Sequence, residues 1–410
     1  MNAPESDAHA RAGVGYSENP ASFEAGVEAA RAALRQAGVD QCDLVLLFAT
    51  DKQDPNLLRD GVRSVVGAKP RLIGGAATGV ITNDRRGHEG HQVGVAVVAA
   101  PSLRTTMYIE RGLPDNELVV GRGLATQIKH DRVDSESAIV LLYDIVKERM
   151  SDGLSLNMAT PLLAGFAEVL GHDVDVVGGG LVGSMQWNPG FQFFDDAVEQ
   201  NSAMALVLEG GVHMDTVTLH GCVPSSGYHR ITKSDGNVVL ELDGEPTLDV
   251  IARLSGDPDL SNWQDYPLFI TLGVNHGDKY GPYREEDYAV RLCMAVDRER
   301  RGLVFFGDDL TAGTEVQIMR RTIDFDYLRR RIEELLGRLE GRKPFLGLYI
   351  DCAGRADVFT VTDREEAEEV QRAVGSAFPL LGWYVGCEIA RAGPIIQSHN
   401  WTGILCILSE

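Results

Sequence analysis

The sequence predicts a protein between the α/β and α+β classes, in which repeated helix–strand–helix–strand–strand units form mixed sheets flanked by helices. Three observations indicate this. Amphipathic segments alternate with short apolar runs, a glycine-rich strand recurs in three blocks, and hairpins replace this alternation in the segment 221–320. The hairpins imply sheets that are partly antiparallel, so a doubly wound nucleotide-binding fold is not expected.

The first block begins with residues 21–37, whose small and apolar residues line one face of a helix that Gly38 ends. The apolar run 43–50 is too short for a helix and is typical of a buried strand. The block continues with a helix that has proline near its first turn, a glycine-rich strand and a closing strand, over 55–67, 71–82 and 91–100.

The same order returns twice. The second block is predicted as helix, strand, helix, glycine-rich strand and strand over 116–129, 137–145, 157–171, 174–185 and 202–211. The third block repeats this order over 323–339, 344–352, 364–378, 379–390 and 402–410. One supersecondary unit therefore occurs three times in the chain.

The three glycine-rich strands, LIGGAATGVI, VVGGGLVGSM and LLGWYVGCEI, can be superposed. Glycine weakens a strand, so its recurrence at one place indicates a close backbone approach, a bulge or a bend that faces a ligand. Tight packing of one unit on another and contact with a ligand both explain the pattern, and at this stage both remain open.

The segment between the second and third blocks has a different character. Residues 227–244 are typical of a hairpin with Asp235 and Gly236 in its turn. A short helix is expected next, then a strand, a polar loop and two more strands, over 246–254, 267–274, 275–287, 288–297 and 302–308. We therefore expect a flexible N-terminus (1–20, with about the first 15 residues loose), an N-terminal domain (21–220) and a C-terminal domain (221–410).

Charge and composition exclude several classes of protein. The 410 residues contain 38 Lys and Arg against 60 Asp and Glu, a formal net charge of -22. Such a surface repels phosphate, which argues against nucleic-acid partners and anionic membranes. The polar N-terminus lacks a signal pattern and no long apolar stretch occurs, so a cytoplasmic location without a membrane span is expected. The cysteines contain no CxxC, which is typical of free thiols in a reducing compartment.

The usual nucleotide, metal and hydrolase motifs are absent from the sequence. The glycines at 74–79 and 178–180 lie within strands and do not open a helix, so they are not a dinucleotide fingerprint. No GxxxxGK[ST] or GxSxG occurs. His88 and His91 have the wrong spacing for a helical metal site, and a solvated turn explains DRRGHEGH, so no metal site is expected.

Candidate ligand-binding residues concentrate in the C-terminal half. Asp351 and Arg355 follow a buried strand, where Arg355 could hold a carboxylate or simply pair with Asp351 to fix the turn. Cys387 and Glu388 interrupt a glycine-rich strand, and a carboxylate there needs a partner, either an ammonium group of a ligand or an internal cation. His399 and Asn400 precede the last strand, where ligand contact and backbone hydrogen bonding are both open.

Three further residues are candidates for contact with a ligand or a cofactor. Arg291 lies within the apolar strand YAVRLCMAV and needs an anion or another partner. His276 in the polar loop and His220 at the joint between the halves are candidate haem ligands together with His399, although a haem pocket has no spacing signature.

With these residues in view, the sequence resembles the FIST family, which has an N-terminal and a C-terminal part. The resemblance runs from about residue 40 to 410. It is carried by DLVLLFAT, LIGGAATGVIT, VVGGGLVGS, ITKSDGNVVLELDGEPTLDVI, CAGR, GWYVGCEIA and HNWT in this order. One departure is visible, since Cys387 stands where the family usually has glycine before the glutamate of its GEI motif.

The resemblance implies a cytoplasmic sensory protein that binds a small ligand, an amino acid or a relative. Because glycine-rich strands recur and polar residues cluster at strand ends, the leading hypothesis places this ligand between the two halves, in contact with the glycine-rich backbone and with Arg355, Glu388, His399 and Asn400. The resemblance also implies signalling through a partner such as a kinase or a cyclic-di-nucleotide enzyme. A family branch resembles nitric-oxide sensors that hold haem b through a histidine, so a haem-based gas sensor is the second hypothesis. The third hypothesis is an enzyme that uses Cys387 or Glu388. It ranks last because no set of nucleophile, base and orienting residue can be identified in the sequence. Whether the protein forms a homodimer does not follow from the sequence.

Overall fold

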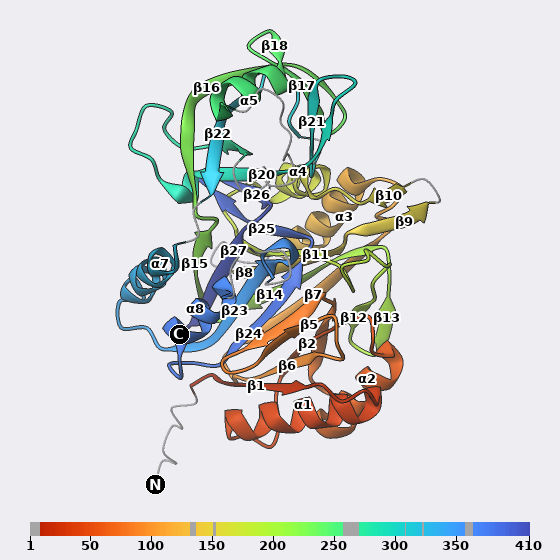
Figure 1. Cartoon of the computed structure of the whole chain (residues 1–410). Helices are drawn as coiled ribbons and strands as arrows, with labels where there is room; N and C mark the ends of the chain where they lie inside the picture. Colours follow the sequence, from red (N-terminus) through yellow and green to blue (C-terminus); the bar gives the residue numbers. More distant parts are fainter. Residues whose placement is uncertain are drawn as a thin grey trace.

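The computed structural model describes residues 9–131, 137–150, 153–256, 270–307, 309–321, 324–356 and 364–410. Its fold is the predicted mixture of helices and mixed sheets, built from three similar units and one insert (Figure 1). Unit 1 comprises β1 (Arg11–Ser17), α1 (Ser22–Ala37), β2 (Leu44–Ala49), α2 (Pro55–Val66), β3 (Arg71–Ala76), β4 (Gly79–Thr82), β5 (Arg86–His88) and β6 (Val93–Ala99).

Unit 2 follows the same order. It comprises β7 (Arg104–Arg111), α3 (Glu117–His130), β8 (Ala138–Asp144), β9 (Val146–Met150), β10 (Gly153–Leu156), α4 (Ala159–Leu170), β11 (Asp175–Leu181), β12 (Gln192–Phe194), β13 (Ala197–Glu199) and β14 (Ser202–Glu209). Strands β9 and β10 form a separate two-stranded sheet.

Unit 3 is interrupted after its first strand. It comprises β15 (His213–Leu219) and then, after the insert, α7 (Phe325–Gly337), β23 (Pro344–Cys352), the 3-10 turn η3 (Ala353–Arg355), α8 (Glu366–Val374), β24 (Leu380–Val385), β25 (Cys387–Ala392), β26 (Ile395–His399) and β27 (Gly403–Ser409).

Each unit contributes four strands to one six-stranded sheet and a hairpin to the sheet of another unit. The sheet orders are β1-β6-β2-β3-β12-β13, β7-β14-β8-β11-β25-β26 and β15-β27-β23-β24-β4-β5. Unit 1 therefore completes the sheet of unit 3, unit 3 completes that of unit 2, and unit 2 completes that of unit 1. The predicted single glycine-rich strands (71–82, 174–185 and 379–390) were wrong in this respect, because each segment leaves one sheet and enters, or leads into, the next.

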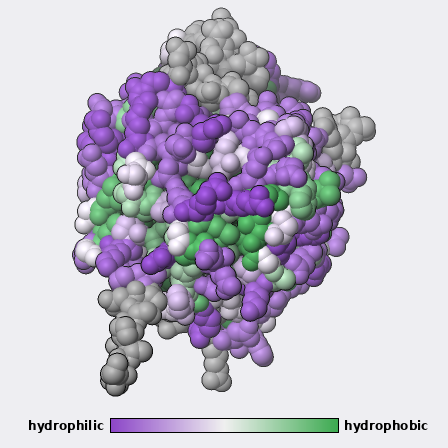
Figure 2. Space-filling model, turned by 90° about the horizontal axis from the view of Figure 1, so that it is seen from below, coloured by the Kyte–Doolittle hydropathy of each residue, from purple (hydrophilic) through white to green (hydrophobic). Residues whose placement is uncertain are grey.

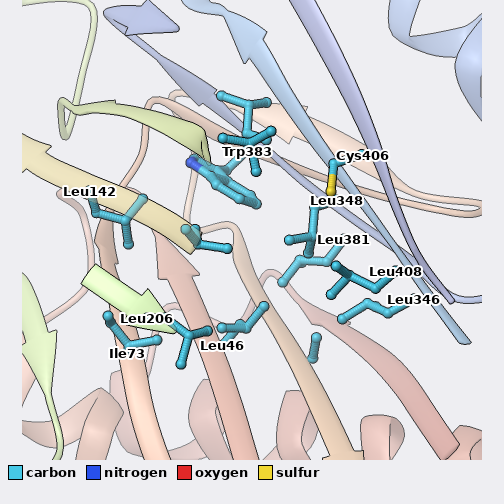
Figure 3. Close-up of a cluster of buried hydrophobic side chains, with 14 of the residues drawn as sticks. Leu46, Ile73, Leu142, Leu206, Leu346, Leu348, Leu381, Trp383, Cys406 and Leu408 are labelled. Carbon is cyan, nitrogen blue, oxygen red and sulfur yellow. The ribbon is translucent and has the colours of Figure 1, made fainter. Parts of the chain in front are cut away.

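The three sheets enclose one apolar core and carry their helices on the outside (Figures 1 and 3). Strand β2 is a continuous apolar run because its side chains are buried on both faces of the sheet. Leu44, Leu46 and Phe48 join the central core, while Val45 and Leu47 pack under α1 and α2. The Phe48 ring stacks on Trp383 with centroids 4.0 Å apart, which joins the sheets of units 1 and 3 at the centre.

The recurring glycines are explained by backbone contact within each sheet. A Cβ at Gly74 would lie 1.9 Å from the Leu47 carbonyl oxygen, and one at Gly178 would lie 1.8 Å from that of Leu141. Both glycines have a positive φ, 150° and 155°, which other residues rarely adopt. Packing between strands, rather than a ligand, therefore accounts for glycine at these two positions.

The insert has its own sheet and core. It comprises β16 (Cys222–Asp235), β17 (Val238–Leu242), β18 (Glu245–Pro246), α5 (Thr247–Ser255), β19 (Thr271–Asn275), the 3-10 turn η2 (Glu285–Asp287), β20 (Tyr288–Asp297), β21 (Gly302–Phe305) and β22 (Glu315–Arg321). The order of the sheet is β16-β22-β19-β20-β21-β17-β18. The predicted hairpin is confirmed, with Gly236 at φ 55° in its turn. Residues 267–269 of the predicted strand 267–274 lie outside the described residues.

The N-terminus corrects another expectation. Residues 11–17, predicted to be loose, form β1, which pairs with β6 over its whole length. Gly13 and Gly15 allow this, because a Cβ at either would lie within 2.3 Å of a carbonyl oxygen of α1. All six cysteines are free and buried, as predicted.

The lower face of the molecule is largely hydrophilic (Figure 2). Figure 2 views the molecule from below, the end that carries α1 and α2 in Figure 1, and shows a band of hydrophobic residues across a largely hydrophilic face. Phe23 of α1 and Leu57 of α2 are exposed apolar residues, 39% and 50% accessible. Among the described helices, none combines the length and the apolar character needed to cross a membrane.

The close approach at Gly178 gives a first test. Gly178→Ala places a methyl group on the Leu141 carbonyl, so we expect a loss of about 3 kcal/mol or more of unfolding free energy, measured by urea denaturation. The control is Gly337→Ala at the end of α7, where a Cβ meets nothing within 4 Å and a neutral or slightly stabilising effect is expected. Equal stability of the two variants would contradict the close approach.

Candidate functional site

The polar residues singled out near the C-terminus lie together around residues 399–402, the turn from β26 to β27. Asp351 and Arg355 come from the end of β23 and from η3, Glu388 from the start of β25, and His399 from the end of β26. All four have no exposed surface. We call them the buried polar cluster. Burial of this much charge is costly unless the groups are paired, so their partners decide what the cluster does.

Arg355 uses its guanidinium to join four segments of the chain. Its Nε lies 2.8 Å from Asp351 Oδ1 and its Nη2 lies 3.2 Å from Glu366 Oε2 of α8. Its Nη1 donates to the carbonyl oxygens of Leu219 at 2.6 Å and Trp401 at 3.3 Å. All three guanidinium nitrogens thus have partners within the protein. Of the two sequence interpretations, the internal pair with Asp351 is the one that the geometry supports.

Burial shifts the carboxyl groups of the cluster toward their protonated forms. Burial raises the pKa of Asp351 to about 7, although the Arg355 charge opposes this rise. Burial and the nearby Asp351 charge also raise the pKa of Glu388 well above its usual value. Glu388 Oε2 accepts a hydrogen bond from the Thr402 N–H at 3.1 Å, while its Oε1 has no partner among the described residues. A protonated Glu388 has a hydrogen to donate rather than a free carboxylate to act as a base.

His399 is enclosed and has unused hydrogen-bonding groups. Neither ring nitrogen has a hydrogen-bond partner within the described part of the chain. Burial lowers the pKa of His399 to about 3, with Arg291, His220 and His276 adding to the effect. The imidazole is therefore neutral at physiological pH, with one donor and one acceptor open to water or a ligand atom.

The turn that follows His399 is strained and held by its own side chains. Trp401 is 6% exposed and has φ 56°, which is uncommon for a residue other than glycine. The Asn400 side-chain amide donates to the His399 carbonyl at 3.0 Å, and the Thr402 hydroxyl donates to the Asn400 carbonyl at 2.8 Å. The guanidinium of Arg321 lies over the Trp401 ring, 5.3 Å from its centroid. Such a conformation persists where the surroundings enforce it.

Sequence reasoning missed Glu366 and Arg321. Glu366 pairs with both Arg355 and Arg321 and is buried. Its segment REEAEEV resembles a solvated helix start. The signal that could have found it is its spacing of four and eight residues from Val370 and Val374, which places Glu366 on the buried face of α8.

Arg291 and Asn400 join the insert to the core. Arg291 pairs with Asp309 through Nε at 2.8 Å and through Nη2, and its Nη1 donates to the Ser398 carbonyl at 2.8 Å. The Asn400 N–H donates to the Val290 carbonyl at 3.2 Å. The partner that a buried arginine in β20 needs is therefore Asp309.

The two remaining histidines, His220 and His276, differ in whether a ring nitrogen is left to bind a ligand. His220 Nδ1 accepts from the Cys222 N–H at 3.0 Å, and His220 Nε2 lies 3.1 Å from the Glu285 carbonyl. Both ring nitrogens of His220 are thus engaged. His276 is partly buried, and its Nε2 has no partner among the described residues. Burial and the Arg291 charge lower its pKa to about 4.

A small cavity lies beside the buried polar cluster. Its lining includes Tyr143, Thr160, Arg291, Cys387 and Asn400, and its volume is about 10 Å³. This is room for about one water molecule. Burial and the Glu388 charge raise the pKa of Cys387 to about 12, so its thiol is protonated and poorly suited to act as a nucleophile.

A larger groove opens next to this cavity. Its volume is about 450 Å³, and its lining is largely apolar and shares Met158, Phe306 and Gly307 with the cavity. The other lining residues are Leu156, Trp187, Asn237, Met294 and Phe305. The groove lies between unit 2, which supplies Leu156, Met158 and Trp187, and the insert, which supplies the rest. We call it the inter-domain groove.

Two of the three candidate haem ligands, His220 and His399, do not fit a haem in this arrangement. His220 has no free ring nitrogen, and His399 is fully enclosed. Neither the small cavity nor the inter-domain groove is lined by His220, His276 or His399. We therefore assign no haem chemistry to these residues.

Comparison with known families gives a clear result. The FIST N domain matches residues 43–245 and the FIST C domain matches residues 247–391. The chain belongs to the FIST family. FIST domains are generally sensory domains that bind small ligands. The boundary between the two FIST domains falls in β18, whereas the sheet of the insert begins at Cys222.

The curated relatives carry no functional name. An uncharacterized protein of Mycobacterium tuberculosis (strain H37Rv) is 26% identical over 238 residues, 57% of this chain and 60% of the relative. An uncharacterized protein of Methanocaldococcus jannaschii is 32% identical over 273 residues, 59% of this chain and 51% of the relative. The chain thus spans between half and two thirds of the relatives it matches. A crystal structure of cyanuric acid hydrolase from A. caulinodans is similar at a TM-score of 0.27 and 10% identity, covering 50% of this chain and 72% of that one.

The role of Arg355 in this FIST protein can be tested by stability. Arg355→Gln leaves the buried Asp351 without its cation and removes one of the two arginines that pair with Glu366. We therefore expect a loss of about 3–5 kcal/mol of unfolding free energy in urea. Arg329→Gln is the control, because Arg329 of α7 is 53% exposed and pairs with Asp326 and Glu333, which are 70% and 64% exposed. At such a surface position a loss of about 1 kcal/mol or less is expected. Similar small losses for both variants would show that Arg355 is not a structural tie.

The depressed pKa of His399 predicts a pH dependence. An unfolded histidine binds a proton near pH 6.5, whereas folded His399 does so near pH 3, so stability falls as the pH drops through this window. Relative to His399→Gln, the wild type should lose about 2 kcal/mol between pH 7 and pH 5. This double difference cancels the opposite slope that the raised pKa of Asp351 produces. His130→Gln, at an exposed position, should follow the wild type. A constant difference between the wild type and His399→Gln would contradict the prediction.

Proposed function

We propose that this FIST protein is a sensor that binds a small ligand, an amino acid or a related metabolite, in the inter-domain groove. The observation that carries the proposal is the groove itself. Its volume of about 450 Å³ lies within the range of small-molecule sites, and both the N-terminal and C-terminal parts line it. A ligand there would touch unit 2 and the insert at once, which is what a sensor needs if binding is to change how the two parts sit.

The lining favours a ligand with an apolar portion. Met158, Met294 and the rings of Trp187 and Phe306 supply adaptable and aromatic contact area, with the two ring centroids 5.7 Å apart. At the inner end, the small cavity adds Tyr143, Cys387 and the hydroxyls of Thr160 and Ser398, which lie 3.4 Å apart. The cavity has room for one water molecule, and such a water would link these groups to the polar end of a ligand in the groove. The Arg291 charge is balanced by Asp309, so this end favours a neutral or zwitterionic group over a free anion.

The polar cluster has a supporting role in this proposal. Arg355, Glu388, Asp351 and His399 hold the strained turn 399–402, and Asn400 of that turn lines the small cavity. We therefore assign ligand contact to Cys387, Asn400 and the groove residues, and assign positioning to Arg355, Glu388, Asp351, His399 and Arg291. The bound state would be read by a partner protein, for which a signalling kinase or a cyclic-di-nucleotide enzyme remains the proposal that the family resemblance supplies.

A binding screen with matched variants tests the site. The purified protein is titrated with each of the twenty amino acids and with haemin, by calorimetry and thermal shift. We expect an amino acid with an apolar side chain to bind, and Met158→Ala combined with Met294→Ala to weaken that binding about tenfold or more, because two apolar contacts are lost. Val119→Ala, at a position of α3 that is 53% exposed and away from the groove, is the control.

Two results would overturn the groove as the ligand site. One is binding that the Met158 and Met294 variant does not weaken. The other is the absence of any response to the amino acids together with a Soret band in the haemin sample, which would favour the gas-sensor hypothesis instead.

A further inference from the structure

A second hollow lies on the other side of the joint between the insert and the core. It has a volume of about 360 Å³ and is formed by β15, η2, α7 and the turn from β25 to β26. The lining includes two threonines and four arginines, Thr216, Thr218, Arg284, Arg331, Arg338 and Arg391. We call it the arginine hollow. It shares no lining residue with the inter-domain groove.

Four guanidinium groups in one hollow are unexpected in a chain with a net charge of -22. The carboxylates on the hollow are Glu286 and Asp287. Glu286 neutralises part of the charge, since it lies 3.0 Å from Arg284 Nη2 and 3.3 Å from Arg331 Nη2. Arg331 also lies 3.3 Å from Glu285 Oε2 and 3.2 Å from Glu334 Oε2, and Arg284 lies 4.0 Å from Asp287 Oδ2. Carboxylates therefore balance the charges of Arg284 and Arg331.

The other two arginines have no such neutralisation. Arg338 donates to the Thr216 carbonyl at 2.9 Å, and Arg391 donates to the carbonyls of His172 at 2.5 Å and Pro394 at 3.0 Å. These bonds fix the direction of both guanidinium groups. The acidic group near Arg391 is Asp175, whose pKa burial raises and the Arg391 charge lowers. Within the described residues, neither arginine has a carboxylate within the 4.0 Å of an ion pair.

We propose that the arginine hollow binds a phosphorylated small molecule. Arginine forks match phosphate oxygens with two parallel hydrogen bonds, and several arginines that line one hollow favour a multiply charged group over a single carboxylate. The volume lies within the range of small-ligand sites, so a molecule of about nucleotide size fits better than a bare ion. The site differs in place and in ligand chemistry from the inter-domain groove.

The position of the hollow gives binding a consequence. η2 belongs to the insert, while β15, α7 and β25 belong to the core, and the Gly393 N–H already donates to the Glu286 carbonyl at 2.8 Å across this joint. The neighbouring Glu285 accepts from the His220 and Gly221 N–H groups, each at 2.8 Å. A phosphate held by arginines from both parts bridges them and stabilises the joint opposite the inter-domain groove.

Calorimetry and thermal unfolding of the full chain test the site, with inorganic phosphate and AMP as probes at constant ionic strength. We expect both probes to raise the melting temperature of the wild type and AMP to bind more tightly. Arg338→Gln combined with Arg391→Gln should weaken the binding of both probes at least tenfold. Arg329→Gln is the matched control. Arg329 lies on α7, the helix that Arg338 ends; it is 53% exposed and pairs with Asp326 away from the hollow.

Further variants keep the test decisive. If the double variant does not fold, Arg338→Lys and Arg391→Lys retain the charge but lose the fork, and each should weaken binding several-fold. Met158→Ala combined with Met294→Ala should bind the probes as the wild type does, which separates this site from the groove. The proposal is overturned if sodium chloride at matched ionic strength gives the same shift, if neither probe binds, or if Arg329→Gln weakens binding as much as the hollow variants.

Discussion

The fold depends on the close approach of backbones where a glycine of one strand meets the carbonyl of its parallel neighbour. At Gly74 and Gly178 a single methyl group would occupy the place of a carbonyl oxygen. Each of these two glycines lies in a strand of one sheet, and the chain then leads into another sheet. The three sheets thereby share strands as well as a core, and Trp383, stacked on Phe48, lies at the centre of that core (Figure 3).

The buried polar cluster lies beside the place where the chain passes from β24, in the sheet of unit 3, to β25, in the sheet of unit 2. Cys387 and Glu388 occupy the start of β25, where the chain passes from the sheet of unit 3 into that of unit 2, and the interrupted β15 of unit 3 brings the insert to the same end. The charges that this arrangement buries are paired within the chain, Arg355 with Asp351 and Glu366, and Arg291 with Asp309. These pairs hold the turn 399–402 against the insert and so shape the inter-domain groove.

The sequence predicted the three units well, because each combines strong helical periodicity with short apolar strands. The crossing of strands between sheets could not be predicted, since glycine at 74 or 178 is equally consistent with a bulge, packing or a ligand. The sequence placed Asp351 and Arg355 after one strand and His399 and Asn400 before another, but it did not show that these residues lie together. Their roles depend on partners distant in sequence, and Glu366 was hidden in an acidic segment. The groove was not predicted either, because Met158 and Phe306 carry no signal of a site by themselves.

Hydrogen–deuterium exchange of the full chain, with and without the amino acid that binds most tightly, tests most directly whether a ligand lies between unit 2 and the insert. Protection of amides in 155–160 and 302–307, with α1 and α2 unchanged as an internal reference, is the result that a ligand in the inter-domain groove predicts. Protection confined to other segments, with 155–160 and 302–307 exchanging as in the free protein, would place the ligand elsewhere and contradict the assignment.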